Sequence, residues 1–386
     1  MKKARLRSGF TTGACAAAAA KAALVTLMGM EGVREVEIPF PDGLRRTIAI
    51  KRAERTGPAA GHRAIASVIK DAGDDPDVTN GAEITAEIRP LYGQGGDGPQ
   101  MSEDGPGIEL IFRAGPGVGM VTRPGLALPP GEPAINPGPR KMIRAAVIDG
   151  LKEAERAGKE TGSGRIPRRF QITLSIRDGQ ALAHKTLNAR LGIEGGLSIL
   201  GTTGIVRPVS AKAWTDTIDV SLNVAWESGC REVLLSTGRT SERVVQGLLA
   251  LPDEALIMMG DYLEHTLKSA GRYSFDRLHV AGMWAKVVKA ALEIPQTHVR
   301  HGALEPLQAV ALLEELSPGG RLAPGIRHLV SQANTARHIL EILQEHGQGR
   351  LIRAVCLKAR DYCQRISGHS VTLYLVSGNR QIIEKV

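Results

Sequence analysis

The second half of the chain repeats one arrangement, in which a short apolar segment runs into a glycine and a stretch with helical spacing follows. The apolar segments are residues 197–200, 232–236, 255–259 and 278–281, and the glycines are Gly201, Gly238, Gly260 and Gly282. Buried strands that alternate with helices are typical of βα units, which build a parallel sheet wound by helices. The pattern therefore predicts a Rossmann-like α/β domain with a mainly parallel sheet over residues 197–386.

The first half of the sequence has a different pattern of expected strands and helices. Alternating apolar and polar residues predict strands at 33–39, 46–51, 64–70, 82–89, 109–113 and 169–177. Helical spacing predicts a helix at 141–157 and an alanine-rich helix within 8–28, with Thr11 or Thr12 as its N-cap. Because 386 residues exceed one typical domain, we expect an α+β domain over 1–196 before the Rossmann-like one.

The end of the chain is expected to add three helices and a hairpin. The helices are predicted at 304–316, 329–346 and 351–366, and the hairpin strands at 371–376 and 381–386. Cys356 and Cys363 lie on the apolar stripe of the last helix, so packing is their expected role. The sequence leaves open which of the two domains the hairpin joins.

Net charge restricts the kinds of partner. The formal charge is +9 and the isoelectric point is about 9.5, which suits nucleic acid, an acidic membrane surface or an acidic small molecule. Aromatic residues make up only 3% and no nucleic-acid motif is present, and the run 16–20 is too short to span a membrane. We expect an acidic small molecule, no nucleic acid and no membrane. Four cysteines without a common zinc spacing predict a reduced, cytoplasmic protein.

Two distant runs of small residues and hydroxyls are candidate ligand sites. Residues 8–13 precede a helix N-terminus, where backbone N–H groups favour anions. Residues 201–204 read Gly-Thr-Thr-Gly, with Arg207 close behind. Glycine allows a ligand to approach the backbone, but a turn that needs glycine for its geometry explains the second run equally well.

These two runs together resemble the cobalt-precorrin-5B C(1)-methyltransferases, the CbiD family. Further segments agree with the family and follow in order over about the first two thirds of the chain: 70–79, 121–125, 131–137, 191–196 and 236–242. The last third matches loosely. The chain departs from the family pattern at Ala14, at Gly260-Asp261-Tyr262 and at Trp284-Ala285-Lys286, which puts individual contact residues in doubt more than the reaction.

The resemblance implies methylation of C1 of cobalt-precorrin-5B by S-adenosylmethionine, giving cobalt-precorrin-6A in anaerobic cobalamin biosynthesis. It implies a corrinoid substrate with several carboxylates, cobalt that belongs to the substrate, and no metal bound by the protein. Two alternatives stay open. One is a corrinoid carrier without chemistry, and the other is a nicotinamide-dependent corrin reductase, which the absence of G-x-G-x-x-G at the ends of the expected strands disfavours. The oligomeric state is not predicted.

The expected site residues follow from the strand ends and the two runs. Cofactor contacts are predicted for Gly201, Thr202, Thr203, Gly204, Thr237, Gly238, Gly260 and Asp261, and substrate contacts for Ser8, Thr11, Thr12, Arg207 and Arg239. Asp261 would hold the ribose hydroxyls, or alternatively cap the helix after it. His298 is the candidate catalytic base, with a surface role as its alternative. The acidic segment 71–77 reads as a turn and receives no role.

Overall fold

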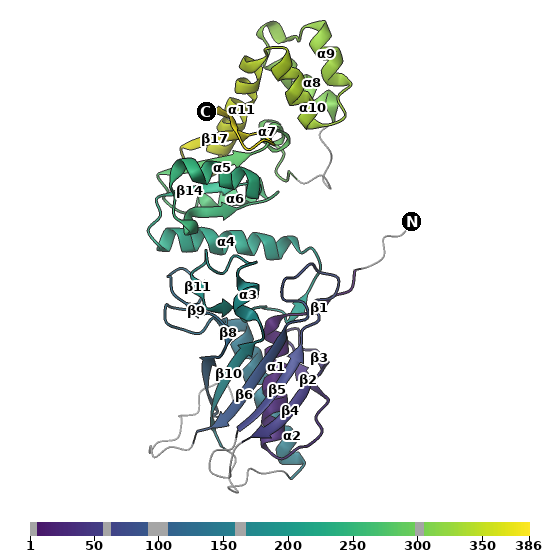
Figure 1. The fold of residues 1–386 in the computed structure, drawn as a ribbon, viewed down its shortest axis with the longest axis vertical. Coiled ribbons are helices and arrows are strands. Elements are labelled where there is room, and N and C mark those ends of the chain that lie inside the picture. Colours follow the sequence, from purple (N-terminus) through teal and green to yellow (C-terminus); the bar gives the residue numbers. More distant parts are fainter. Residues whose placement is uncertain (1–5, 57–62, 92–106, 159–166, 298–304) are drawn as a thin grey trace. The chain divides into compact units, whose positions relative to one another are not determined.

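The computed structural model describes residues 6–56, 63–91, 107–158, 167–297 and 305–386. The chain divides into two compact units, Met1–Ser210 and Ala211–Val386, and each contains helices, strands and a large buried apolar cluster of its own (Figure 1).

The first unit is built on a five-stranded sheet in the order β4-β5-β6-β10-β7. Neighbouring strands are antiparallel, except that β10 and β7 are parallel. The bounds are β4 Arg52–Thr56, β5 Arg63–Ile69, β6 Glu83–Pro90, β10 Arg169–Ile176 and β7 Glu109–Ala114. Alternation predicted four of these strands, and they are confirmed. The strand β4 was missed because its largely charged sequence carries no apolar period.

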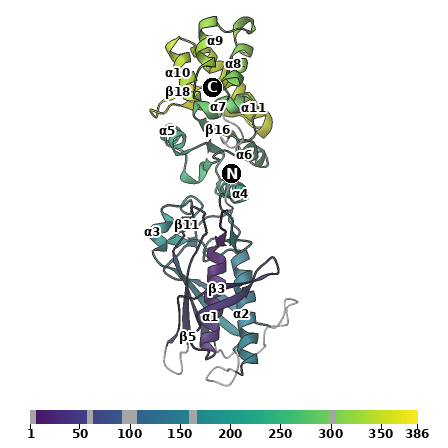
Figure 2. The ribbon, with the colours of Figure 1, turned by 90° about the vertical axis from the view of Figure 1, so that its right-hand side faces the viewer.

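Two helices cover one face of this sheet, α1 (Thr12–Leu27) and α2 (Pro137–Arg156) (Figure 2). The N-cap of α1 is Thr11, whose side chain accepts a hydrogen bond from the Ala14 N–H at 3.2 Å. All residues of α1 are buried, since alanine side chains let its backbone pack closely against the sheet and α2. The even-numbered residues of β6 and β10 face these helices and are buried, so the odd-numbered residues face away from them.

Short elements complete the first unit. The hairpin predicted at 33–51 is confirmed as β2 (Glu35–Pro39) and β3 (Arg45–Ala49). Two-residue strands form three further pairs: β1 Gly9–Phe10 with β13 Ile205–Val206, β8 Gly117–Val118 with β12 Gly196–Leu197, and β9 Met120–Val121 with β11 Ile193–Glu194. The short helix α3 spans Gly179–Ala183.

One strand expected in the second unit belongs to the first. Residues 197–200 were predicted to open the parallel sheet, and this prediction is wrong. Only Gly196–Leu197 is a strand, and it pairs with β8, while Ile199 bridges to Ile135. An apolar segment shows that it will be buried but not in which core, and here Leu197 and Ile199 pack with the helices and sheet of the first unit.

The second unit has a five-stranded sheet in the order β15-β14-β16-β17-β18. The first four strands are parallel and β18 is antiparallel to β17. The bounds are β14 Glu232–Ser236, β15 Leu256–Met258, β16 Arg277–Gly282, β17 Val371–Val376 and β18 Ile382–Lys385. The C-terminal hairpin therefore extends the sheet of its own unit, which decides the question that the sequence left open.

Helices lie on both faces of this sheet. The helices of the unit are α4 Ala211–Glu227, α5 Arg239–Leu249, α6 Leu263–Ala270, α7 Trp284–Ala291, α8 Pro306–Glu315, α9 Pro324–Ser331, α10 Ala336–Glu345 and α11 Gly349–Ser367. On one face α5 packs through Val245 on Leu234, Ala281 and Tyr374, and on the other α4, α6, α7 and α11 share the large core. Strands buried on both faces explain the continuous apolar runs in this half of the sequence.

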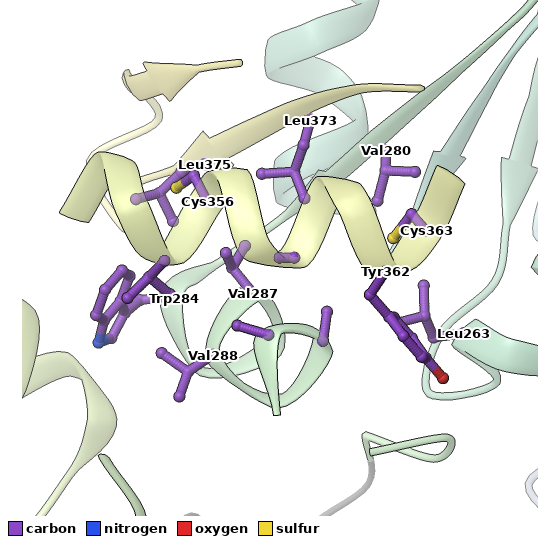
Figure 3. Close-up of a cluster of buried hydrophobic side chains, with 14 of the residues drawn as sticks. Leu263, Val280, Trp284, Val287, Val288, Cys356, Tyr362, Cys363, Leu373 and Leu375 are labelled. Carbon is purple, nitrogen blue, oxygen red and sulfur yellow. The ribbon is translucent and has the colours of Figure 1, made fainter. Parts of the chain in front are cut away.

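The helix α11 shows how that large core is packed. Figure 3 shows Cys356 and Cys363 of α11 on the same side of the helix as Leu373 and Leu375 of β17, whereas Tyr362 extends from the other side beside Leu263. Side chains of α7 lie below the helix in this view. The expected packing role of the two cysteines is confirmed, and burial raises the pKa of each thiol to about 12.

The prediction of a single helix at 329–346 is wrong, because the structure has two helices there. The first, α9, ends at Ser331, and α10 begins at Ala336. Thr335 is the N-cap of α10, and its side chain accepts a hydrogen bond from the His338 N–H at 3.1 Å. A capping threonine thus divides the apolar period, which continues across both helices.

Candidate functional site

The two small-residue runs of the first unit lie side by side. The Thr11 N–H donates to the Gly204 carbonyl at 3.0 Å, and the Leu200 N–H donates to the Thr12 hydroxyl at 2.9 Å. Strand β1 pairs with β13. Residues almost two hundred positions apart in the sequence therefore form one structure around the N-terminus of α1.

Some side chains of this cluster are buried and form internal hydrogen bonds, whereas others are exposed to solvent. The hydroxyls of Thr11 and Thr12 are buried and bond to backbone groups, so the structure gives them a structural role. By contrast Ser8, Thr202 and Arg207 are exposed, and Thr203 is exposed while its hydroxyl bonds to the Ile205 backbone. Ligand contacts by any of these six residues stay a prediction.

The two glycines of the run 201–204 are required by packing. Gly201 has a φ of +116°, and a Cβ there would lie 2.4 Å from the Thr11 Cβ. Gly204 has a φ of +78°, and its Cβ would lie 2.6 Å from the Phe40 ring. Glycine geometry, one of the two explanations of this run, is therefore sufficient, and the run lies in the first unit rather than at the edge of the parallel sheet.

The acidic segment that received no role anchors other parts of the first unit. Asp71 forms an ion pair with Arg7, and the Arg7 N–H donates to Asp74 at 2.6 Å. The Val209 N–H donates to Asp75 at 2.9 Å. This loop therefore binds both the start of the described chain and the last residues of the unit.

The remaining candidates lie where parallel strands of the second unit end. The chain leaves β14 for β15 on one side and later returns to β16 on the other side of β14, which makes the β14/β16 boundary a topological switch point. In open α/β sheets ligands bind outside the carboxyl ends of the strands at such a point. Thr237 and Gly238 follow β14 directly, and the Thr237 N–H donates to the Ala281 carbonyl of β16 at 3.0 Å.

The helix α5 begins at this point. Its N-cap, Gly238, provides no capping side chain, and a Cβ at Gly238 would meet open space. The first turn of a helix leaves backbone N–H groups without helical acceptors, and Arg239 is exposed there. Glu242 in the same turn is buried and accepts a hydrogen bond from the Ser236 hydroxyl at 3.1 Å. N–H donors and a carboxylate therefore lie within one turn.

Asp261 has partners that the sequence did not predict. It forms an ion pair with Lys286 of α7 and accepts a hydrogen bond from the Thr297 hydroxyl at 3.2 Å. The alternative in which Asp261 caps the following helix is wrong, because the N-cap of α6 is Tyr262 and has no side-chain cap bond. Asp261 instead joins the end of β15 to α7.

A second lysine belongs to the same group. Lys289 is buried and donates to the Thr297 carbonyl at 3.0 Å, as does Lys286. Burial, together with the neighbouring Lys286 charge, lowers the pKa of Lys289. Sequence reasoning had noted Lys286 only within a departure from the family pattern, because its ion pair with Asp261 depends on the tertiary fold. His298 directly follows this group but lies outside the described residues.

An exposed aromatic side chain lies over Gly260. The ring of Trp214 in α4 is 3.1 Å from the position that a Gly260 Cβ would occupy, and it stacks on Tyr262 with ring centroids 6.5 Å apart. Trp214 is 46% exposed. A flat, exposed ring beside a strand end can stack on an aromatic ligand group.

A large groove lies on the first unit, on the sheet face opposite α1 and α2. Its volume is about 1110 Å³, and its floor includes Thr85 of β6 and Thr173 and Ser175 of β10. The sequence analysis missed this groove. The polar half of the alternation in β6 and β10 marked a face turned away from the helical layer, but it could not show that the face is hollowed.

Nowhere in the described ranges do three or more His, Cys, Asp or Glu side chains gather in a way that could hold a metal ion. None of the helices described is both long and apolar enough to cross a membrane.

Comparison with known proteins gives consistent results over nearly the whole chain. The CbiD family model matches residues 1–208, and the model of the CbiD C-terminal domain matches residues 296–386. A cobalt-precorrin-5B C(1)-methyltransferase of Desulfotalea psychrophila is 48% identical over 98% of this chain and 97% of its own length. Proteins with the same name from Geobacter sulfurreducens and Geotalea daltonii are 45% and 43% identical, covering 92% and 99% of this chain and 91% and 98% of their own lengths. The family resemblance inferred from short motifs is thereby confirmed, and the chain belongs to the CbiD family.

Proposed function

We propose that this protein transfers a methyl group from S-adenosylmethionine to C1 of cobalt-precorrin-5B, giving cobalt-precorrin-6A and S-adenosylhomocysteine. The observation that carries the proposal is identity of 48% over 98% of the chain to a relative named for the C1 methylation. The four free cysteines suit a reducing compartment, and we place the reaction in the cytoplasm.

The reaction needs alignment more than a covalent catalyst. The pair of electrons on C1 forms the new carbon–carbon bond, and the electrons of the S–CH₃ bond remain on sulfur, which leaves as a neutral thioether. The protein must hold the donor sulfur, the methyl carbon and C1 in line and exclude water. Such positioning lowers a barrier by about 7–11 kcal/mol.

We place the cofactor at the carboxyl ends of β14, β15 and β16, in a sheet that we interpret as Rossmann-like. The N–H groups at the start of α5 suit the methionyl carboxylate, and the buried Glu242 in the same turn suits a nearby cation such as the ammonium. The exposed ring of Trp214 suits the adenine. Asp261 supports this site through its ion pair with Lys286 and would reach the ribose only by exchanging partners.

The proposal is tested first by calorimetric titration of the protein with S-adenosylmethionine, S-adenosylhomocysteine and NADPH. We expect saturable binding of both sulfur ligands and none of NADPH. Methyl-labelled S-adenosylmethionine is then incubated with the protein and enzymatically prepared cobalt-precorrin-5B, and label is expected at C1 of the corrinoid. Corrinoid binding without any transfer of label would instead indicate a carrier, and binding of NADPH alone would indicate a reductase.

Two variants test whether Trp214 contributes to binding of S-adenosylmethionine. Trp214→Ala removes an exposed ring and should weaken S-adenosylmethionine binding by about tenfold, as loss of one stacking contact does. Leu248→Ala is the matched control, because this side chain is 54% exposed on α5 and lies away from the strand ends. Equal affinities of both variants and the unmodified protein would remove Trp214 from the cofactor site.

A further inference from the structure

We infer that the groove on the open face of the first unit's sheet binds the corrinoid through its peripheral carboxylates, with Arg52 and Arg177 as the binding cations. The inference rests on the proposed function for the identity of the ligand. It goes further in naming the site and the residues that hold the substrate.

The size and position of the groove suit a large, flat ligand. Its volume of about 1110 Å³ is slightly above the range of about 300–1,000 Å³ for small-molecule sites, which suits a macrocycle. One face of the sheet is covered by α1 and α2, and the groove lies against the other, bordered by the segment that leads into α3. A rigid sheet thus forms its floor.

The charges at one end of the groove favour an anion. Lys51, Arg52 and Arg177 surround the single carboxylate of Glu83, at 2.6, 3.7 and 3.5 Å. Glu83 also accepts a hydrogen bond from the Ser67 hydroxyl at 2.8 Å and is only 9% exposed. The hydrogen bond from Lys51 lowers the pKa of Glu83, so Glu83 is ionised at neutral pH and offsets only one of the three cations.

The two arginines have donors available for a ligand. Their distances to Glu83 exceed those of a hydrogen bond, and among the described residues neither guanidinium donates one. Their side chains are 48% and 71% exposed. Guanidinium groups bind carboxylates through paired N–H donors, so each arginine can hold one acid group on the rim of a macrocycle.

The floor provides neutral donors between these charges. The hydroxyls of Thr85 and Ser175 line the groove, and in the part of the chain that the structure describes they have no hydrogen-bond partner. Ile65 adds an apolar surface beside them. Another floor residue, Glu87, is paired with Arg63 at 3.2 Å. A ligand with an apolar ring and polar edges matches this floor.

One wall of the groove is fixed by contacts between backbones. Gly117 has a φ of +81°, and a Cβ there would lie 2.0 Å from the Ile176 carbonyl oxygen. A Cβ at Gly179 would lie 2.3 Å from the Gly117 carbonyl oxygen. These approaches hold the turn that carries Arg177 against the β8 strand, so the backbone from which this arginine extends is fixed before a ligand arrives.

The test measures binding of stable corrins by the full-length protein. The probes are dicyanocobyrinic acid, whose side chains end in carboxylates, and dicyanocobinamide, whose side chains end mainly in amides, each followed by its visible absorption in equilibrium dialysis. We expect saturable binding of the acid and much weaker binding of the amide. Arg52→Gln and Arg177→Gln should each weaken acid binding by about tenfold, the loss expected for one charge-assisted contact.

Two further variants sharpen the test. Asp178→Asn removes an exposed carboxylate from the groove rim and should tighten acid binding by up to about fivefold. Arg89→Gln is the matched control, because Arg89 is exposed on the same face of β6, beyond the groove, and pairs with Gln171. Its affinity should equal that of the unmodified protein.

Three binding results and one activity result would overturn the inference. The first binding result is that dicyanocobyrinic acid does not bind saturably, and the second is that the acid and the amide bind equally well. The third is that Arg52→Gln, Arg177→Gln and the control Arg89→Gln all bind the acid with the affinity of the unmodified protein. Methyl transfer to cobalt-precorrin-5B is measured separately. Transfer at the normal rate by Arg52→Gln and Arg177→Gln at subsaturating substrate would therefore reject the groove while leaving the proposed function intact.

Discussion

Lys70 of the first unit is a buried lysine that forms an ion pair with Asp77. The Lys70 side chain is 1% exposed, and its ammonium lies 2.6 Å from the Asp77 carboxylate. Burial by itself raises the pKa of Asp77, but the hydrogen bonds from Lys70 and Thr79 outweigh it, so this pKa is lower than usual. The Asp77 carboxyl group is therefore ionised at neutral pH, and without Lys70 it would be a poorly solvated charge.

Replacing Lys70 tests this pair. Lys70→Met should lower the free energy of unfolding by about 3 kcal/mol, because it leaves Asp77 without its cation. Lys70→Met/Asp77→Asn should recover part of the loss, since no uncompensated charge remains. Urea unfolding at several pH values is the measurement. A depressed carboxyl pKa contributes stability above the unfolded pKa of about 3.9, so the difference between Lys70→Met and the unmodified protein should shrink as pH falls below it. A constant difference down to pH 2 would contradict this account.

The N-terminus of α1 depends on a segment far away in the sequence. Residues 200–206 supply hydrogen-bond partners for Thr11, Thr12 and Gly13, and Gly201 packs directly on Thr11. The start of one helix is thus completed by a loop that the sequence placed in another domain.

Two glycine variants distinguish the cost in stability of a steric contact from the cost of backbone strain. A positive φ costs a residue other than glycine about 1–3 kcal/mol. Gly201→Ala should lower the free energy of unfolding by more than this, because its Cβ would also overlap Thr11. Gly195→Ala is the control. Gly195 has a φ of +81°, but a Cβ there would meet nothing within 4 Å, so only the strain cost applies. Equal losses in thermal or urea unfolding would show that the contact with Thr11 contributes nothing.

The whole molecule consists of two units with separate cores. The apolar clusters of Met1–Ser210 and Ala211–Val386 share no residue. The candidate groove belongs to the first unit and the candidate cofactor site to the second. If these two proposed sites hold the substrate and the cofactor, methyl transfer requires both units.

Expressing each unit alone tests this division. Fragments 1–210 and 211–386 should each show a near-ultraviolet circular dichroism signal and a cooperative urea transition, because each retains its own core. The first fragment should bind dicyanocobyrinic acid and the second S-adenosylmethionine, while neither alone transfers methyl. A fragment that is unfolded at low urea, although the full chain is folded, would show that its core depends on the other unit.

Much of the architecture was determined by local sequence. Alternation in β5, β6 and β10 and helical spacing in α2 and α11 act over a few residues, so their period predicts them directly. The glycines near the ends of β14, β15 and β16, which are Gly238, Gly260 and Gly282, were likewise recognisable from the local sequence. The family was also recognisable, because short motifs such as those at 8–13 and 236–242 keep their order along the chain.

Only the tertiary structure decided where those elements meet. Residues 197–200 are apolar enough for either core, and long-range hydrogen bonds to Thr12 place them in the first. Asp261 could have capped a helix, but Lys286 of α7 reaches it across the sheet edge. The groove arises because helices cover just one face of a sheet whose polar residues are spread over separate strands. Local periods determine which element forms and which side is buried, whereas contacts between distant residues determine what lies beside it.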